Sequence, residues 1–349
     1  MEIRIARNTD RDTWNSYVTG HPDASPYHLF AWKEAVEGAY GHRGYYLIAG
    51  ENGSTKGVFP LFHMHLPVLQ NELVSLPFCD LGGILADSPT TTQALLDESL
   101  ALGRDLKTKS IHIRIRNHSE IYERLSYPCH CTKDKVSMLL TLPGTSEILW
   151  NGFKSKLRSQ IRKAEKNGLR FEWGNAKIDE FYSVFSRNMR DLGSPVHAKK
   201  WIQAILHHYD QQAQTGLIYK DKTPIGAGII LLLPGQKVSI PWASTLREYN
   251  RLGPNMLLYW NFLKFAADNS FLQFDFGRST PGEGTYKYKA QWGAKPNVLH
   301  WYQVFLRHKI QGTNPSMAGK REVIEQIWQK MPLGMANLLG PRLRRYISL

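Results

Sequence analysis

The stretch at residues 271–293, which reads FLQFDFGRSTPGEGTYKYKAQWG, joins a strand pattern to a glycine-rich turn. Residues 272–276 alternate apolar and polar side chains, which predicts a half-buried strand. Residues 277–284 combine glycine, proline and hydroxyl side chains, and this composition predicts a turn at which backbone can approach a ligand. In the run at residues 286–289, alternation predicts that Lys287 and Lys289 lie on one side and the two tyrosines on the other.

A lysine beside aromatic rings, at the end of a strand and next to a glycine turn, can stabilise negative charge that develops on an oxygen. Lys289 is therefore a candidate catalytic cation, and Arg278 and Lys287 are candidate contacts for an anionic substrate. The alternative interpretation is that these lysines are solvated residues of an edge strand, where lysine guards against aggregation.

Working outward from this stretch, the same order of elements occurs twice along the chain: a hairpin, an extended piece, a helix and a strand. The extended pieces begin with the similar triplets LPF at 76–78 and IPW at 240–242. The other elements fall at 45–49, 57–63, 91–106 and 110–116 in the first copy, and at 217–220, 226–233, 254–267 and 272–276 in the second. Any α/β protein shows some repetition of this kind, but the shared order of the elements favours a duplication. We predict an α/β (α+β) fold of two similar domains, each a mostly antiparallel sheet flanked by helices.

The length of 349 residues fits two domains, and we place them at 1–145 and 146–310, followed by a tail at 311–349. The formal charge of +14 predicts an anionic partner, which can be a nucleic acid, a phosphorylated substrate or an anionic membrane surface. No membrane span or secretory signal is apparent, so a cytoplasmic location is expected. The Cys129-His130-Cys131 cluster lacks the further ligands that a zinc site needs, and no metal is expected.

The segment between the two copies, residues 146–167, has the spacing of an amphipathic helix. Its basic residues recur every fourth position on one face, and Arg158 and Arg162 are candidate phosphate contacts. A solvated face is the alternative. The tail carries an apolar stripe that Pro332 interrupts, followed by three arginines. Such a basic amphipathic segment can lie on anionic lipid at the inner face of a membrane, dock a partner, or pack on its own domain.

The segment at 242–257, WASTLREYNRLGPNML, has the layout of a strand, a glycine turn and a helix N-terminus, where free backbone N–H groups converge on an anion. The turn at 250–255 resembles the pyrophosphate-binding turn of acetyl-CoA-dependent N-acetyltransferases. Asn255, which stands where that pattern has a small residue, is a candidate phosphate contact. It departs from that pattern because Pro254 lacks one N–H donor.

Taken with the paired copies and the sequence MRDLGSP at 189–195, the FGRS motif at 276–279 and the Tyr288-Lys289 pair resemble the Fem family, in particular the FemAB-like proteins associated with exosortase and exopolysaccharide gene clusters. The resemblance covers residues 1–310 and implies two tandem GNAT-like acyltransferase domains. It implies transfer of an aminoacyl group from aminoacyl-tRNA to an amine, and it matches Tyr288 and Lys289 to an aromatic residue and a lysine at the family's reaction centre.

The leading hypothesis is therefore an acyltransferase of Fem type. It would act on a peptidoglycan, cell-envelope or exopolysaccharide precursor, which is an anionic small molecule or is lipid-linked. No resident cofactor is expected, and the donor is an aminoacyl-tRNA or an acyl-CoA. The alternatives are an acetyl-CoA-dependent N-acetyltransferase and a non-catalytic module that tethers an assembly to the membrane through its tail.

Overall fold

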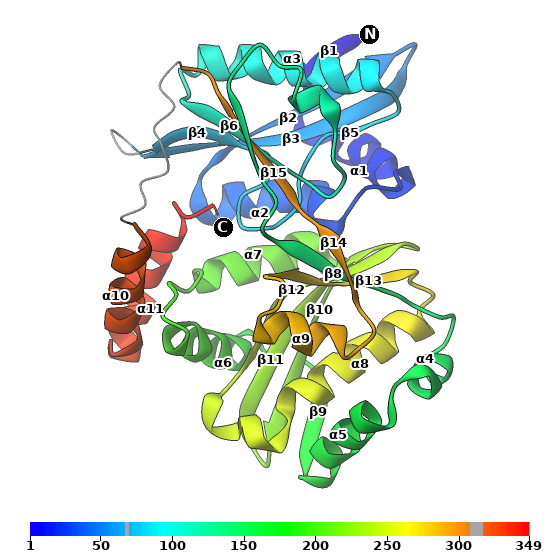
Figure 1. The fold of residues 1–349 in the computed structure, drawn as a ribbon, viewed down its shortest axis with the longest axis vertical. Helices are drawn as coiled ribbons and strands as arrows, with labels where there is room; N and C mark the ends of the chain where they lie inside the picture. The colour runs from blue at the N-terminus through cyan, green and yellow to red at the C-terminus, as the bar shows by residue number, and fades with distance from the viewer. Residues whose placement is uncertain (67–69, 308–316, 349) are drawn as a thin grey trace.

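The computed structural model describes residues 1–66, 70–307 and 317–348. The described residues form an eight-stranded first sheet and a seven-stranded second sheet, stacked with helices between them and on both outer sides (Figure 1). The strand order is β1-β2-β3-β4-β6-β15-β7 in the first sheet, where β5 pairs with β3, and β14-β8-β13-β12-β11-β10-β9 in the second.

The strands of the first sheet are β1 (Glu2–Ile5), β2 (Arg43–Glu51), β3 (Ser54–Leu66), β4 (Gln70–Val74), β5 (Leu85–Ala86), β6 (Ser110–Ile115), β7 (Cys129–Thr132) and β15 (His300–Phe305). Its helices are α1 (Arg11–Gly20), α2 (Phe30–Tyr40) and α3 (Pro89–Asp105). Helix α3 starts two residues before the predicted range, because the Ser88 side chain caps the Thr91 N–H and proline occupies the first turn.

The strands of the second sheet are β8 (Val136–Thr141), β9 (Leu169–Trp173), β10 (Ala213–Lys220), β11 (Thr223–Leu233), β12 (Lys237–Thr245), β13 (Gln273–Ser279) and β14 (Lys295–Val298). Its helices are α4 (Ser146–Gly152), α5 (Ser155–Lys166), α6 (Ile178–Asp191), α7 (Lys199–Tyr209), α8 (Pro254–Asp268) and α9 (Gly284–Ala290). Two further helices, α10 (Met317–Gln329) and α11 (Leu333–Arg344), form a hairpin that packs on α6. No helix within the described ranges is long and apolar enough to cross a bilayer.

The predicted duplication is present in the strand pairing. In the first sheet β2 and β3 form the hairpin, and β4 runs parallel to β6 after the crossover through α3. In the second sheet β10 and β11 form the hairpin, and β12 runs parallel to β13 after the crossover through α8. The triplets at 76–78 and 240–242 both follow the point at which parallel pairing ends, which gives their similarity a structural meaning.

The two sheets exchange strands. Strand β8, which lies in the predicted N-terminal domain, pairs with β13 and β14 of the second sheet, whereas β15 returns from the end of the second copy to pair with β6 and β7 of the first. Sheet membership therefore does not follow chain order, and the boundaries at 145 and 310 stay a prediction.

The core has three apolar layers. One lies between the first sheet and α3, one between the two sheets, and one between the second sheet and the α4, α5 and α8 helices. In the middle layer α2 packs on α7, and Trp201 meets Trp32 edge to face and stacks on Tyr40. A continuous aromatic layer therefore joins the two copies, and it holds them in a fixed relation.

Two predicted local structures were wrong. Residues 286–289 belong to helix α9 and not to an alternating strand, so Lys287 is exposed while Lys289 is buried. Residues 146–167 form two helices, α4 and α5, because residues 153 and 154 adopt extended backbone between them. Their apolar residues still face one core, since Leu149, Phe153 and Leu157 are all buried together.

Two buried histidines, His28 and His197, predict that the protein loses stability in acid. Burial lowers the pKa of His28 to about 3 and holds the pKa of His197 well below its usual range. Because an unfolded histidine titrates near pH 6.5, the unfolded chain takes up protons below that pH which the folded chain does not. The stabilisation from each neutral histidine is complete above about pH 6.5. Below that pH it falls by about 1.4 kcal/mol per pH unit for each histidine.

Urea titrations check this expectation. The free energy of unfolding should be about 2–3 kcal/mol lower at about pH 5.5 than at about pH 8, and a His28→Gln, His197→Gln variant that still folds should lose most of this difference. Equal values for the unsubstituted chain at the two pH values would contradict it.

Candidate functional site

The candidate site begins where the parallel strands β12 and β13 separate. They pair only through residues 237–239 and 273–275, although both strands continue further. Pro241 cannot donate a backbone hydrogen bond, and Gly277 takes the left-handed φ of +74° that other residues avoid. The chain locally favours separation at this point, which leaves backbone carbonyl groups of β13 free for other partners.

Lys289 fills this position from the last turn of α9. Its side chain is buried, and its Nζ atom donates to the carbonyl oxygens of Gly277 at 3.1 Å and Arg278 at 2.7 Å. Burial lowers the pKa of Lys289 to about 8, while the carboxylates of Asp275 and Asp80 favour its charged form. An ammonium group has three N–H donors, so two are used by the turn and one is left for a ligand.

Asp275 is the residue of this region that the sequence pattern missed. Alternation placed it on the solvated face of the strand, but it is 3% exposed. Its carboxylate accepts from Arg116 Nη2 at 2.5 Å, Ser137 Oγ at 2.6 Å and the Gly277 N–H at 2.8 Å. The signal in the sequence was an aspartate between two phenylalanines in a strand. A carboxylate buried among apolar residues requires hydrogen-bonding or charged partners.

Arg278 extends the same cluster toward the first sheet. Its guanidinium lies 3.4 Å from the Asp80 carboxylate and 5.3 Å from the centre of the Trp301 ring. We call the set Arg116, Asp275, Ser137, Arg278, Asp80 and Lys289 the polar junction. Arg116, which follows β6, and Asp80 come from the first copy, whereas Asp275, Arg278 and Lys289 come from the second. The cluster therefore lies where the two copies meet.

A second feature lies at the N-terminus of α8, and helix α9 contributes to it as well as to the polar junction. An open pocket of about 530 Å³, which we call the α8 pocket, is lined by α5, the turn at 250–253 and α9. Its lining includes Lys163, Arg251, Lys287 and Tyr288. The Tyr288 hydroxyl is buried and has no hydrogen-bond partner in the described part of the chain. Adjacent residues of α9 therefore serve different places, because Lys289 faces the junction and Tyr288 lines the pocket.

The structure places the predicted phosphate contacts in different regions of the molecule. The predicted anion turn does line the α8 pocket, but Asn255 is not part of the lining, and the side chain of Asn250 accepts from Thr245 at 2.8 Å. Arg158 donates to the Asn151 carbonyl and Arg162 lies over the Trp150 ring, so both face α4. The basic residue of α5 that lines the pocket is Lys163, which sequence spacing did not single out.

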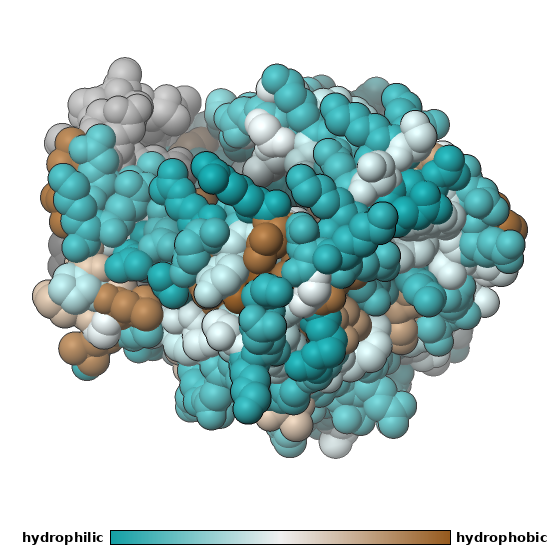
Figure 2. Space-filling model, turned by 90° about the horizontal axis from the view of Figure 1, so that it is seen from below, coloured by the Kyte–Doolittle hydropathy of each residue, from teal (hydrophilic) through white to brown (hydrophobic). Residues whose placement is uncertain are grey.

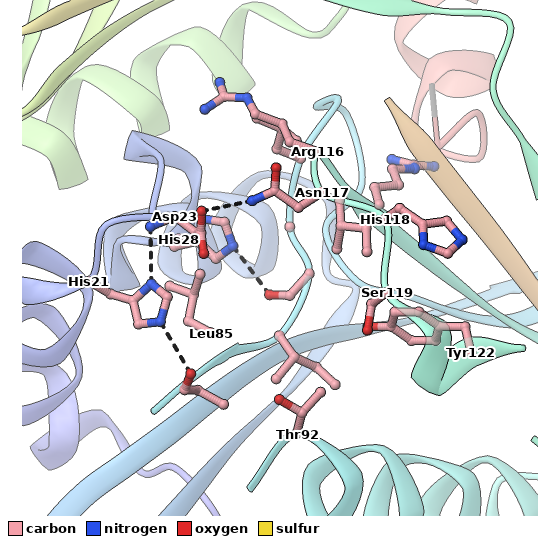
Figure 3. A pocket seen from close by; sticks show the side chains of 17 residues that line it. His21, Asp23, His28, Leu85, Thr92, Arg116, Asn117, His118, Ser119 and Tyr122 are labelled. Carbon is pink, nitrogen blue, oxygen red and sulfur yellow. Dashed lines mark hydrogen bonds between the residues drawn. The ribbon is translucent and has the colours of Figure 1, made fainter. Parts of the chain in front are cut away.

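A smaller cavity of about 190 Å³ lies on the other side of Arg116, within the first copy. Figure 3 shows Asn117 donating to Asp23 across it, with His21 and His28 nearby and the Arg116 side chain extending away from this pair. Arg116 Nε is buried without a hydrogen-bond partner among the described residues. Arg116 therefore connects this cavity to Asp275 and the polar junction.

This arrangement can support acyl transfer. The α8 pocket offers three cationic side chains to an anionic donor, and the junction, which shares helix α9 with the pocket, offers a buried ammonium group to an oxygen that gains charge. No group of three or more histidine, cysteine, aspartate or glutamate side chains in the described ranges could hold a metal ion.

The chain is similar to known proteins in sequence and in fold. Residues 151–290 match the family described as an acetyltransferase (GNAT) domain. The chain is 24% identical over 206 residues to a lipid II:glycine glycyltransferase of Staphylococcus epidermidis, a match that covers 53% of this chain and 47% of that protein. It thus spans about half the length of the curated relatives it matches.

Two solved structures share the fold. FemX has a TM-score of 0.72 at 15% identity over 87% of this chain and 97% of that one. A tandem GNAT protein from the clavulanic acid biosynthesis pathway has a TM-score of 0.52 at 10% identity over 88% and 100%. These likenesses confirm the predicted fold of two tandem GNAT-like domains.

Proposed function

We propose that this chain, a FemAB-like protein with a GNAT domain, transfers an aminoacyl or other acyl group to an amine of a cell-envelope precursor. The observation that carries the proposal is the buried ammonium of Lys289, held where β12 and β13 separate, on the helix α9 that also lines the α8 pocket. A peptidoglycan precursor is the first acceptor to test, because the matched relative is named for lipid II. An exopolysaccharide precursor is the second.

The proposed chemistry is direct transfer. The acceptor nitrogen attacks the ester carbonyl carbon, the new N–C bond forms, and the C–O bond to the donor breaks. Negative charge gathers on the carbonyl oxygen in between, and the remaining N–H of Lys289 would stabilise it. With a pKa of about 8, Lys289 is mainly an ammonium group at neutral pH and suits this role. The proton lost by the attacking amine ends on the departing donor oxygen.

The lining of the α8 pocket favours an anionic donor. Lys163, Arg251 and Lys287 can each contact phosphate. The turn that would hold the pyrophosphate of coenzyme A lacks one N–H donor at Pro254, so its grip on that group is weakened. We therefore propose the 3′ end of an aminoacyl-tRNA as the donor.

Replacing Lys163 and Lys287 by alanine is expected to weaken donor binding at least about tenfold and to reduce its dependence on salt. The matched control is Arg158→Ala with Arg162→Ala, which removes the same charge from the same region but away from the pocket. The measurement is binding of purified protein to charged tRNA, acetyl-CoA and longer acyl-CoAs at two salt concentrations.

The outcomes of this screen separate the hypotheses. Binding of acetyl-CoA alone favours the N-acetyltransferase alternative, and binding of no donor favours a non-catalytic module. Equal loss in both double variants would mean that the charges act only through the overall field of the protein.

The proposal includes contact with a membrane surface. A lipid-linked acceptor would be found there, and the basic amphipathic pattern of the C-terminal tail is suited to the same place. Such contact would bring the enzyme and its acceptor together.

A further inference from the structure

The hairpin of α10 and α11 carries an unusual share of exposed apolar side chains. Eight of the fifteen exposed large hydrophobic residues in the described ranges lie between positions 323 and 347. They are Val323, Ile324, Ile327, Met335, Leu338, Leu339, Leu343 and Ile347. Figure 2, which views the molecule from below, shows apolar side chains gathered along the edge where this hairpin lies. Single exposed apolar residues are ordinary, but a contiguous group of them marks an interaction surface.

The opposite side of the hairpin is anchored, so the apolar side chains have a fixed orientation. Trp328 and Ala336 are buried, and Gly340 approaches the backbone of Val196 so closely that a Cβ atom there would lie 3.0 Å from the Val196 nitrogen. Arg190 of α6 also donates to the Met331 carbonyl at 3.2 Å. The exposed face is therefore a built surface and not the consequence of a loosely packed helix.

Hydrogen bonds after α11 place the hairpin beside the meeting of the two copies. The Ser348 carbonyl accepts from the Phe78 N–H at 2.7 Å, and the Arg345 carbonyl lies 2.7 Å from His42 Nε2. From the second copy, His197 accepts from Arg344 at 3.0 Å. The exposed face thus has a defined position relative to both copies.

The charge of this segment selects the partner. Residues 317–349 contain six lysines and arginines and two glutamates, a formal charge of +4. However, Arg344 donates to His197 and Arg345 donates to the Tyr40 carbonyl, so these two cations face the rest of the molecule. Among the described side chains of the hairpin, the exposed cations are Lys330 and Arg342. Apolar side chains flanked by cations match the interface of a bilayer, where acyl chains lie beneath phosphate groups. The apolar face alone would also suit a protein partner, whereas the exposed cations Lys330 and Arg342 beside it favour an anionic lipid surface.

We propose that the exposed face of α10 and α11 lies in the interfacial region of a bilayer that contains anionic phospholipid. The leucine and isoleucine side chains enter the boundary of the acyl chains, and Lys330 and Arg342 contact the headgroup phosphates. The docking itself does not depend on the transfer reaction. Its use in bringing the active site to a lipid-linked acceptor rests on the proposed function.

The test is flotation of the full chain with vesicles of phosphatidylcholine that contain about 30 mol% phosphatidylglycerol, compared with vesicles of phosphatidylcholine alone. We expect binding to the anionic vesicles and at least about tenfold weaker binding to the neutral ones. The variant Ile324→Glu, Ile327→Glu, Leu338→Glu is expected to lose at least about tenfold of the binding to anionic vesicles.

The matched control is Ile148→Glu with Leu272→Glu, since these side chains are equally exposed at 58% and 62% but lie outside the hairpin. It should bind vesicles within about twofold of the unsubstituted chain, and both variants should keep its melting temperature.

Two results would overturn the proposal. One is failure of the unsubstituted chain to bind anionic vesicles. The other is a dimer in solution that the triple variant makes monomeric, which would assign the apolar face to a second copy. If the unsubstituted chain fails to bind anionic vesicles but still transfers to a water-soluble acceptor amine in a Lys289-dependent reaction, the docking surface is rejected and the proposed function stays intact.

Discussion

Replacing Lys289 by methionine is expected to slow acyl transfer at least about 10²-fold. Methionine is of similar length and removes the charge, so the variant leaves the developing oxyanion without its nearest buried cation. The loss should appear in kcat more than in KM, because the interaction strengthens only as charge develops on the oxygen. Single-turnover transfer from charged tRNA to an amine acceptor measures it.

The control for this substitution is Lys287→Met, which changes the neighbouring lysine of the same helix at an exposed position. It should affect donor binding but leave the rate at saturation within a few-fold of normal. Because Lys289 also donates to the turn at 277–278, a purely structural role has to be distinguished.

The pH profile makes this distinction. If the ammonium form acts in catalysis, the rate of the unsubstituted chain falls as pH rises through about 8, where Lys289 loses its proton. A variant that keeps this fall, or one that transfers at the normal rate, would remove Lys289 from the mechanism.

Replacing Asp275 by alanine is expected to lower the free energy of unfolding by about 3–5 kcal/mol. The substitution leaves the Arg116 guanidinium largely buried without its carboxylate, and it removes the acceptor of the Ser137 hydroxyl and of the Gly277 N–H. Losing one partner of a buried ion pair costs more than losing the pair, because the remaining charge cannot be solvated. Urea unfolding at neutral pH measures the effect.

Asp179→Ala is the matched control. Asp179 is paired with Lys199, but its side chain is 83% exposed and the pair lies in water. Its removal should change stability by less than about 1 kcal/mol. If the two substitutions cost the same, the burial of Asp275 does not have the consequence that we assign to it.

Most of the fold could be predicted from elements in which the periodic pattern of apolar residues is long enough to recognise. The hairpins at 45–63 and 217–233 and the crossover helices α3 and α8 were predicted because alternation and helical spacing extend over many residues there. Helix α9 was missed because seven residues, GTYKYKA, alternate as a strand would and are too few to show a helical period. The strand exchange was missed because pairing between distant segments leaves no local pattern.

The site was predicted less completely for a related reason. Sequence placed Lys289 and the turn at 250–253 in the region of interest, but spacing on α5 identified a basic face without indicating which side would line a pocket. Arg158 and Arg162 were chosen, whereas Lys163 lines it. The pairing of Asp275 with Arg116 joins residues 159 positions apart, and only the folded chain brings them together.

The exchange of β8 and β15 has a consequence for how the molecule comes apart. Each sheet contains one strand from the copy that forms most of the other sheet. Separating the two copies would therefore break the backbone hydrogen bonds of that strand in each sheet. The two copies are therefore joined by exchanged strands and not only by the chain that connects them. We infer that they melt in one cooperative transition and that a cut near residue 145 yields fragments which persist only while they remain associated.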